Sequence, residues 1–349
     1  MRSRSLAVGL ATALAACATA GPPGTPTAEV PALRETAAVA SARDAADDPA
    51  IWRNPADPAA SLIVATDKQA GLYVYGLDGK TRSELDAGRV NNVDLRDGVD
   101  IAGALGVLVA ASDRTDRAHG KIALFRLDTD AARLRPLGVL PVADGEAYGM
   151  CLWRRAADHA LFAFSVMKDG TVVQARLDLA GPGPRLEVVR TFKLATQSEG
   201  CAADDRTGLL YVAEEDVGLW RIEADPSSAG APKPFAKVDG RSLVADAEGV
   251  ALAPRGRSGG YLVVSSQGDS AYALYRLPDG RFAGRFRIVA GPGGVDGTSD
   301  TDGVEVALGA FGPDLPAGVL VVQDGDNAPD AQNFKLVSWS AVRRALRLP

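Results

Sequence analysis

Carboxylate side chains recur along this chain beside a smaller set of lysine and arginine residues, a combination that can bind a metal ion and a phosphate group. Carboxylates packed together raise one another's pKa unless a cation neutralises them. Oxygen ligands without histidine or cysteine suit calcium better than zinc or copper. The candidate oxygen ligands are Asp47, Asp48, Tyr148, Glu199, Glu214, Glu215, Asp246, Glu248, Gln267, Asp302, Asp324 and Asp326. The candidate phosphate-binding cations are Lys68, Arg114 and Lys168.

Many of these residues belong to a motif that repeats about every fifty residues. In this motif a polar or charged residue precedes a glycine and an apolar stretch. The copies are Asp97-Gly98, Tyr148-Gly149, Glu199-Gly200, Glu248-Gly249 and Asp302-Gly303, with glycine intervals of 51, 51, 49 and 54 residues, and we take Asp48-Pro49 as a sixth copy. A second, apolar segment follows each copy and ends in polar residues, as in Leu62–Lys68 and Leu161–Lys168.

Six copies of a unit with about four short strands predict an all-β fold. The expected architecture is a six-bladed β-propeller with four- to five-stranded antiparallel blades around a central channel. A two-sheet sandwich would not need six equal repeats. A short helix is predicted at Ser340–Leu346. We predict a single propeller domain over residues 35–349.

The propeller geometry places the charged residues on one rim. Consecutive strands of a blade run antiparallel, so the start of the first strand and the end of the second lie on the same face. The repeated motif supplies the starts and the apolar segments supply the ends. The alternative is that each charge merely solvates its own loop tip, and the recurrence of charge in every repeat favours a shared site.

Composition excludes several function classes. A formal charge of −6 gives no basic footprint for nucleic acid, and it would repel a polyanionic substrate unless cations intervene. The two histidines, His119 and His159, stand in polar stretches and are predicted to lie on the surface, which argues against a phosphohistidine phosphatase. Neither Cys151 nor Cys201 has an arginine six residues later, and the sequence contains no Gly-rich phosphate loop followed by Lys-Ser or Lys-Thr.

The N-terminal residues predict export. Residues 1–16 combine a basic start with a short apolar run, and Leu14-Ala15-Ala16-Cys17 resembles the lipobox of bacterial lipoproteins, which implies cleavage before Cys17 and lipidation of its sulfur. Residues 17–34 are predicted to be a flexible tether. We expect the protein to be lipid-anchored at a bacterial cell envelope and to touch membrane through that anchor alone. The alternative is an ordinary secretory signal cut after Ala20.

Cys151 and Cys201 follow Cys17, and an oxidising compartment would allow them to pair. Cys151 stands two residues after its motif glycine and Cys201 one residue after, which sends their side chains to opposite faces of equivalent strands. We therefore expect two separate buried thiols, with a disulfide as the alternative.

Eight segments in order, covering nearly the whole mature chain, resemble motifs of the β-propeller phytases, a family of calcium-dependent alkaline phytases. They are Asp47–Trp52, Gly71–Lys80, Asn91–Asp94, Ser198–Gly200, Ala213–Asp216, Ser265–Gly268, Asp296–Gly303 and Gln323–Gly325. The resemblance implies a six-bladed propeller that binds several calcium ions, some of them structural and others in a cleft for the phosphates of phytate.

Carried over position by position, the resemblance implies roles for individual residues. Catalytic-calcium ligands are implied at Asp47, Tyr148, Glu199, Glu215, Asp246, Glu248 and Gln267. Structural calcium is implied at Asp48 with the Val93 carbonyl, and at a second place with Asp296, Asp324 and Asp326. The resemblance implies catalytic roles for Lys68, Arg114, Tyr148, Lys168, Asp169 and Asp302. Among these, Lys68, Arg114 and Lys168 are the phosphate-binding cations.

Three positions depart from the family pattern. Gln69 stands where a second lysine is common, and Asp169 and Asp326 stand where glutamate is usual. The first departure is expected to weaken the neighbouring phosphate subsite. The loop 326–332 is also shorter, which puts the calcium site beside it in doubt.

The resemblance leads us to expect a calcium-dependent phosphomonoesterase of the 3-phytase type. It would act as a monomer on phytate (myo-inositol hexakisphosphate) or other inositol polyphosphates, bound as calcium complexes, and yield lower inositol phosphates. A calcium-activated water would attack phosphorus while Lys68 and Arg114 orient the phosphate. Two alternatives stay open: a non-catalytic calcium-binding propeller for anionic polymers, and a propeller lactonase or esterase, which would not need the three cations.

Overall fold

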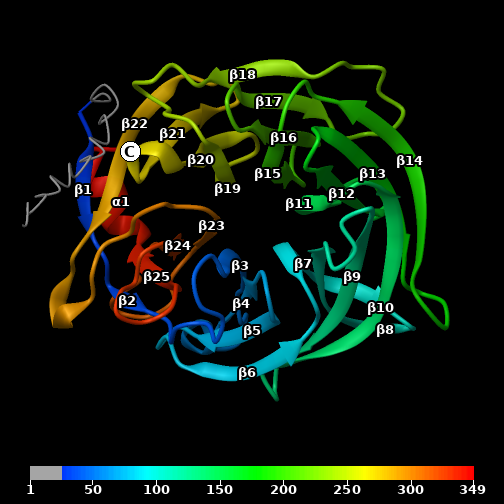
Figure 1. Cartoon of the computed structure of the whole chain (residues 1–349), viewed down its shortest axis with the longest axis horizontal. Coiled ribbons are helices and arrows are strands. Elements are labelled where there is room, and N and C mark those ends of the chain that lie inside the picture. Colours follow the sequence, from blue (N-terminus) through cyan, green and yellow to red (C-terminus); the bar gives the residue numbers. More distant parts are fainter. Residues whose placement is uncertain (1–25) are drawn as a thin grey trace, which may run out of the picture.

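The computed structural model describes residues 26–349, which form six sheets arranged as blades around one axis (Figure 1). Four blades are each built from one continuous segment. Blade 1 holds β3 (Ala46–Trp52), β4 (Leu62–Asp67), β5 (Gly71–Gly76) and β6 (Thr81–Asp86), and blade 2 holds β7 (Val90–Ile101), β8 (Ala104–Asp113), β9 (His119–Asp128) and β10 (Arg133–Asp144). Blade 3 holds β11 (Ala147–Arg154), β12 (Leu161–Met167), β13 (Thr171–Asp178) and β14 (Arg185–Lys193). Blade 4 holds β15 (Ser198–Asp204), β16 (Leu209–Glu214), β17 (Gly218–Glu223) and β18 (Lys233–Lys237).

The last two blades combine C-terminal strands with strands from the N-terminal side. Blade 5 holds β19 (Ala247–Arg255), β20 (Gly259–Ser266), β21 (Ala271–Leu277), β22 (Phe282–Val289) and β1 (Ala28–Pro31), and blade 6 holds β23 (Val304–Leu308), β24 (Gly318–Asp324), β25 (Asn333–Ser338) and β2 (Arg34–Glu35). Strand β1 pairs with β22 in parallel, and β2 pairs with β25 in antiparallel. This joins the two ends of the described chain.

The domain therefore begins earlier than predicted. Residues 28–31 lie within the segment predicted to be a tether, yet they form β1, and Val30 is fully buried. Four residues that include a proline are too few to show strand periodicity, so this strand is visible through its pairing alone. The predicted signal peptide, Cys17 and the first part of the tether lie outside the described residues.

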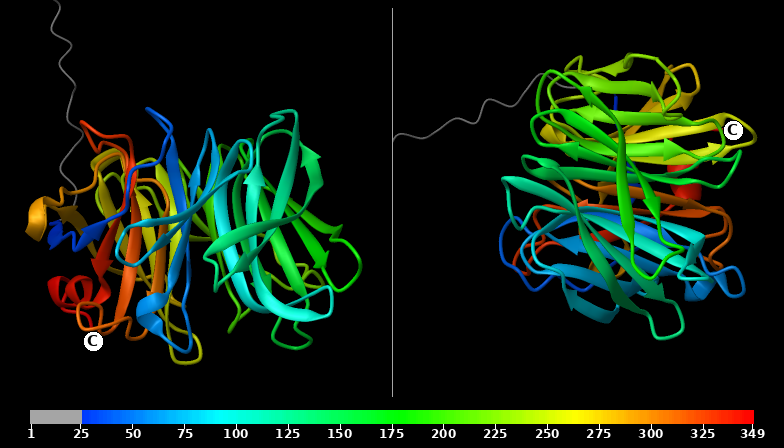
Figure 2. Two further views of the ribbon diagram at one scale, coloured as in Figure 1. Left: turned by 90° about the horizontal axis from the view of Figure 1, so that it is seen from below. Right: turned by 90° about the vertical axis from the view of Figure 1, so that its right-hand side faces the viewer.

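The all-β, six-bladed prediction is confirmed, with four strands in five blades and five in blade 5. The predicted C-terminal helix is α1 (Trp339–Ala345), and three 3-10 turns are η1 (Pro58–Ala60), η2 (Gln267–Asp269) and η3 (Pro292–Gly294). Figure 2 shows from the side how the strands run between the two faces of the disc. Within residues 26–349 no helix has the length and apolar character needed to cross a bilayer.

The hydrophobic core is divided among the interfaces between neighbouring blades. Strand β12 is buried along its whole length, with Leu161 and Ala163 in the cluster shared with blade 2 and Phe162 and Phe164 in the cluster shared with blade 4. A strand that packs against a neighbour on both faces needs apolar side chains at every position. The continuous apolar segments of the sequence follow from this arrangement.

The first strands of the six blades, β3, β7, β11, β15, β19 and β23, contact one another in order and close a ring around the axis. The first five of them bulge near their starts. The bulges lie at Asp47-Asp48, Asn91-Asn92, Tyr148, Glu199-Gly200 and Glu248-Gly249. A bulge re-aims the side chains beside it, and the bulges of these five strands contain the polar residues Asp47, Asn91, Tyr148, Glu199 and Glu248.

The copy of the repeat in blade 2 differs from the one we predicted. Asn91-Asn92 occupies the first bulge of β7, whereas Asp97 lies beside a second bulge toward the other end of this strand and accepts a hydrogen bond from Nε1 of Trp52 at 3.2 Å. Gly98 has a φ of 64°, a left-handed conformation that glycine adopts readily, so a glycine is needed here for the local backbone conformation. The fifty-residue spacing of the glycines led to the prediction of Asp97-Gly98, because the glycine lies at the second bulge and not at the first.

The repeated glycines allow the innermost strands to approach closely. A β-carbon on the motif glycine of one blade would lie within van der Waals overlap of the carbonyl oxygen of the acidic residue in the next. These distances are 1.8 Å from Gly149 to Glu199, 2.2 Å from Gly200 to Glu248, 2.5 Å from Gly249 to Asp302 and 2.3 Å from Gly303 to Asp47. The pairing of an acidic residue with glycine thus brings the carboxylates together at the axis.

Cys151 and Cys201 form a disulfide, contrary to the expectation of separate thiols. Their Cα atoms, on β11 and β15 of adjacent blades, are 5.7 Å apart. The two side chains do point to opposite faces of equivalent strands, but neighbouring blades meet through opposite faces. The pattern that seemed to separate the cysteines therefore brings them into one interface.

Candidate metal and phosphate site

Five side chains occupy equivalent places on the rim where the second strand of each blade ends. In each case the backbone N–H of that residue donates to a carbonyl just before the first strand of the same blade. The pairs are Lys68 to Ala45 at 2.7 Å, Arg114 to Arg89 at 2.8 Å, Lys168 to Glu146 at 3.0 Å, Glu215 to Gln197 at 3.0 Å and Gln267 to Asp246 at 2.9 Å. Blades 1 to 3 thus present cations, and blades 4 and 5 present oxygen ligands.

A second set of polar side chains, one from each blade, comes from the starts of the innermost strands or the residues just before them. Its members are Asp47, Asn91, Tyr148, Glu199, Glu248 and Asp302. Asp47, Glu199 and Glu248 are buried, as are Asn91 and Asp302. The structure therefore brings together Asp47, Glu199, Glu248 and Asp302, four of the carboxylates predicted from the sequence.

The carboxylates form two overlapping groups that meet at Glu199. Ligand atoms of Asp47, Glu199 and Asp302 lie within 4.8 Å of one another, and so do those of Glu199, Glu215 and Glu248. Burial, followed by the charge of Asp47, raises the pKa of Glu199 and places the pKa of neighbouring Asp302 well above its usual range. Burial and the charge of Asp302 do the same to the pKa of Glu248. Such a cluster favours either protons or a bound cation.

Asp246 and Gln267 flank the second group. The charge of Asp246 contributes to the raised pKa of both Glu215 and Glu248, for which burial is the largest cause. Oε1 of Glu215 and Oε2 of Glu248 are buried and have no hydrogen-bond partner among the described residues. Calcium binds oxygen at about 2.3–2.6 Å, so oxygens within 4.8 Å of one another fit around one ion. The acidic half of the rim therefore fits a hard cation.

Asn91 is a site residue that the sequence interpretation missed. Its Nδ2 lies 3.0 Å from Oδ2 of Asp47 and 2.6 Å from Oε1 of Glu199. Its Oδ1 accepts a hydrogen bond from Arg114 at 2.6 Å. The amide links the carboxylates to a cation without adding charge. The signal in the sequence is the Asn91–Asp94 segment, which has no charged residue before a glycine and so differs from the other copies of the repeat.

Lys68 lies between carboxylates of two blades. Its Nζ is 2.6 Å from Asp44, 2.9 Å from Asp47 and 3.4 Å from Asp302. Burial alone would lower the pKa of Lys68, but the charges of Asp47 and Asp302 outweigh it and raise that pKa. The ammonium group therefore stays charged at the centre of the site.

The two other cations lie over the ring of Tyr148. Nζ of Lys168 is 4.6 Å from the ring centroid, and the guanidinium carbon of Arg114 is 5.5 Å from it. Glu146 lies 3.5 Å from Arg114. The charge of Glu199, followed by burial, raises the pKa of Tyr148, which keeps the phenol protonated. Three cations thus stand beside the carboxylates, as a phosphate clamp requires.

Asp169 and Gln69 turn away from this arrangement. The carboxylate of Asp169 pairs with Lys193 at 2.6 Å, and 66% of its side chain is exposed. It is not part of the carboxylate groups around Glu199. The amide nitrogen of Gln69 donates to the carbonyls of Ala42 at 3.1 Å and Asp44 at 3.0 Å, so it holds the loop before β3.

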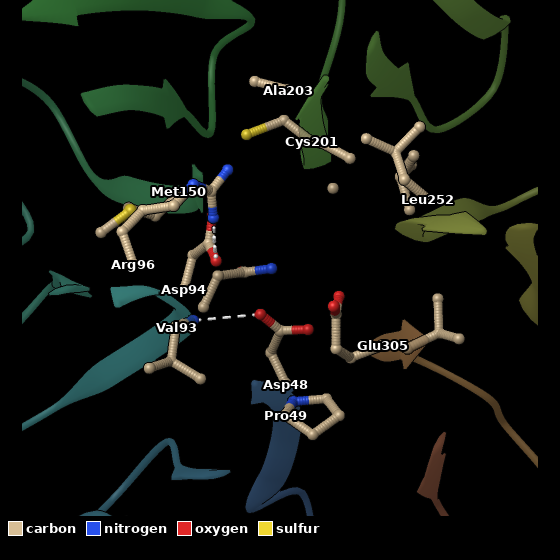
Figure 3. A pocket seen from close by; sticks show the side chains of 15 residues that line it. Asp48, Pro49, Val93, Asp94, Arg96, Met150, Cys201, Ala203, Leu252 and Glu305 are labelled. Atoms are coloured by element: carbon tan, nitrogen blue, oxygen red, sulfur yellow. Dashed lines mark hydrogen bonds and ion pairs between the residues drawn. The ribbon is translucent and has the colours of Figure 1, made fainter. Parts of the chain in front are cut away.

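A polar cavity of about 80 Å³ is lined by the predicted Asp48 and Val93 pair (Figure 3). Oδ2 of Asp48 accepts a hydrogen bond from the N–H of Val93 at 3.0 Å. Glu305, which the sequence interpretation did not include, also lines this cavity, and burial followed by the charge of Asp94 raises its pKa to about 8. The Asp48 and Val93 calcium site stays a prediction.

At the other predicted structural calcium site, the ammonium group of Lys335 lies among the carboxylates. Fully buried Lys335 contacts Asp296 and lies 3.1 Å from Asp324 and 2.6 Å from Glu35. Asp326 is exposed and does not contact this lysine in the structure. The ammonium group already neutralises these carboxylates. A calcium ion here would require Lys335 to move, so this set does not fit a cation as it stands.

Both histidines are exposed, as predicted, and His119 pairs with Asp116 at 2.9 Å. No described histidine or cysteine joins the two carboxylate groups. The site therefore presents oxygen ligands and cations alone, which agrees with the exclusion of histidine-based and cysteine-based phosphatases.

Comparison with known proteins agrees with this geometry. The model of the phytase family matches residues 3–348. The chain is 38% identical over 330 residues to the 3-phytase of Bacillus subtilis (strain 168), covering 91% of this chain and 85% of the relative. A chain in the crystal structure of the mitotic checkpoint complex is similar in fold alone, with a TM-score of 0.51 and 13% identity, over 98% of this chain and 87% of that one.

Proposed function

This chain belongs to the phytase family, and from that premise we propose that it is a phosphoric monoester hydrolase that releases phosphate from phytate with calcium as its cofactor. The observation that carries the proposal is the division of one rim into a cationic part, formed by Lys68, Arg114 and Lys168 of blades 1 to 3, and a carboxylate part around Glu199, Glu215 and Glu248 of blades 4 and 5. A phosphate placed where the two parts meet would contact both.

The two parts have complementary tasks. The carboxylates around Glu199 and Glu248 would hold calcium, because their buried oxygens lie close enough together and two of them lack partners. Bound calcium would neutralise the phosphate charge and promote ionisation of an attacking water. Without such a cation, a formal charge of −6 would oppose a substrate as negative as phytate.

The chain's own cations would orient the substrate. Lys68 reaches the boundary between Asp47 and Asp302, so it would bind a phosphate oxygen next to the carboxylates. Arg114 and Lys168 both lie over the ring of Tyr148 and would bind a neighbouring phosphate on the same inositol ring. Arginine suits this task because its guanidinium forms two parallel hydrogen bonds to phosphate. Substrates with adjacent phosphates should therefore be preferred.

The deciding experiment measures phosphate release from phytate with calcium, with a calcium chelator, and after calcium is restored. Activity should vanish with the chelator and return with calcium. Activity that persists in chelator would defeat the calcium proposal. Tight calcium binding without phosphate release would favour the non-catalytic alternative.

Variants of the cations separate a phosphatase from a lactonase or esterase. Lys68→Met and Arg114→Met should each lower phosphate release on the order of 100-fold or more, because they remove stabilisation of phosphate charge. Arg135→Met is the matched control, since Arg135 is exposed and pairs with Asp128 elsewhere in blade 2. Lactone or ester hydrolysis that survives in both site variants would support the alternative reaction.

We also propose that the protein is exported and lipid-anchored at a bacterial cell envelope, and that it acts as a monomer. The Cys151–Cys201 disulfide supports export, because disulfides persist in oxidising compartments. Mass spectrometry of the mature N-terminus should find an acylated Cys17. An unmodified start after Ala20 would replace the anchor with simple secretion.

A further inference from the structure

The arginine of strand β22, Arg285, is fully buried and belongs to neither part of the site. It stands opposite Ala273 of β21. Its Nη1 donates a hydrogen bond to the carbonyl oxygen of Arg241, and its Nη2 donates to Oδ2 of Asp269. A buried guanidinium is costly unless its donors are used. Nε of Arg285 has no hydrogen-bond partner among the described residues, so the two Nη contacts identify what the residue holds. They join β22 to the segment before β19 and to the turn η2.

Asp269 and Ser266 extend this contact to Val244. Oδ1 of Asp269 lies 2.8 Å from Oγ of Ser266. That hydroxyl oxygen accepts a hydrogen bond from the N–H of Val244 at 2.9 Å and lies 3.1 Å from the Val244 carbonyl oxygen. Segment 241–244 is therefore bound at both ends, directly by Arg285 and indirectly through Asp269.

The same segment leads into a junction that carries two candidate metal ligands. Asp246 accepts a hydrogen bond at its carbonyl from the N–H of Gln267, at 2.9 Å. Beside them, a β-carbon on Gly268 would lie 1.8 Å from the carbonyl oxygen of Ala245, so the two backbones are in close contact. Arg285 contacts residue 241 in the segment that leads to Asp246, and it contacts Asp269 in the turn that begins with Gln267.

We propose that Arg285 is a positioning residue that, through Asp269 and Ser266, sets the places of Asp246 and Gln267 relative to Glu215 and Glu248. It thereby determines how tightly the carboxylate part of the rim binds calcium. This inference rests on the proposed function, in which Asp246 and Gln267 are calcium ligands. Arg285 touches neither substrate nor metal, and its effect is on the geometry of the residues that do.

The test compares Arg285→Met with Arg287→Met, an exposed arginine on the same strand. Calcium affinity is measured by titration calorimetry, and the rise in melting temperature on adding calcium gives a second readout. Loss of a residue that orients metal ligands costs roughly 10- to 100-fold in metal affinity. We expect that loss in Arg285→Met, an intermediate loss in Arg285→Lys, and wild-type affinity in Arg287→Met.

A merely structural role predicts something different. It would lower the melting temperature of Arg285→Met equally with calcium and with chelator and leave calcium affinity unchanged, and that result overturns the inference. If Arg285→Met does not fold, Asp269→Asn decides, because it keeps the shape and removes the charge that Arg285 contacts. Wild-type calcium affinity in Asp269→Asn would then overturn the inference.

A combined variant connects Arg285 to its targets. If Arg285 acts through Asp246 and Gln267, then adding Arg285→Met to a chain that carries Asp246→Asn and Gln267→Met should weaken calcium binding no further. Additive losses would show that Arg285 acts elsewhere. Wild-type affinity in Asp246→Asn would contradict the ligand role itself and thus the proposed function, whereas a loss in Asp246→Asn without one in Arg285→Met would contradict the inference alone.

Discussion

The carbonyl oxygen of Glu248 lies 2.2 Å from the point where Gly200 would carry a β-carbon if it were any other residue. The same contact joins four successive pairs of blades, so the carboxylates stand at the axis because glycines of the neighbouring blade leave room for their backbones. The close packing of neighbouring blades therefore also brings the carboxylates of the site together.

Gly200→Ala should destabilise the fold and disturb the site together. The new methyl group would overlap backbone, which cannot rotate away, and overpacking of this kind costs about 1–3 kcal/mol. Urea unfolding measures the loss, and calcium titration measures the displacement of Glu199 and Glu248. Gly183→Ala is the matched control, since its β-carbon would meet nothing within 4 Å. Equal stability of the two variants would contradict the packing role.

Asn91→Asp should make the fold more dependent on calcium. The amide of Asn91 lies 2.6 Å from Glu199 and 3.0 Å from Asp47, so a carboxylate there would add repulsion that a cation relieves. Compared with wild type, the variant should melt lower in chelator and gain more from calcium. Asn54→Asp serves as control, because Asn54 accepts hydrogen bonds from Ala56 and Asp57 in its own loop. An identical gain in Asn91→Asp and wild type would count against the prediction.

Without calcium, stability should fall as the pH rises. Burial and neighbouring carboxylates raise the folded-state pKa of Glu199, Glu248 and Asp302, and burial raises that of Glu305 to about 8. A group with a raised pKa binds more protons when folded, so its contribution is lost as the pH rises from about 4, the ordinary carboxyl value, toward the folded pKa.

Calcium competes with those protons, so its stabilising effect should grow with pH. Melting curves with calcium and with chelator, recorded at about pH 5 and about pH 9, test this expectation. The calcium-induced rise in melting temperature should be larger at the higher pH. A rise that is the same at both pH values would show that these carboxylates do not bind the ion.

Removing the Cys151–Cys201 disulfide should lower the free energy of unfolding. The bond closes a loop with a sequence separation of 50 residues, for which the chain-entropy relation gives about 4 kcal/mol. Urea unfolding of Cys151→Ala/Cys201→Ala should show this loss relative to wild type. A reductant should bring wild type to the same value and leave the double variant unchanged. No effect of reductant on wild type would mean that the bond is absent or adds no stability.

The sequence by itself determined the number of blades, the rim on which charge gathers and most of the candidate ligands. Strand periodicity and turn residues act over a few neighbours, so they are legible along the chain, and the repeat of glycine after an acidic residue records the contact between adjacent inner strands. The family motifs assigned individual roles to Asp47, Lys68 and Glu199, which the structure brings together.

The tertiary structure decided the features that depend on contacts between blades. Asn91, and not Asp97, belongs to the set of polar side chains from the starts of the innermost strands. Cys151 pairs with Cys201, and Lys335 lies among the carboxylates of a predicted calcium site. In each case the partner comes from another blade or strand, so no local pattern encodes it. Charge balance and the fit of opposed blade faces settle such contacts, and both exist only after the ring has closed.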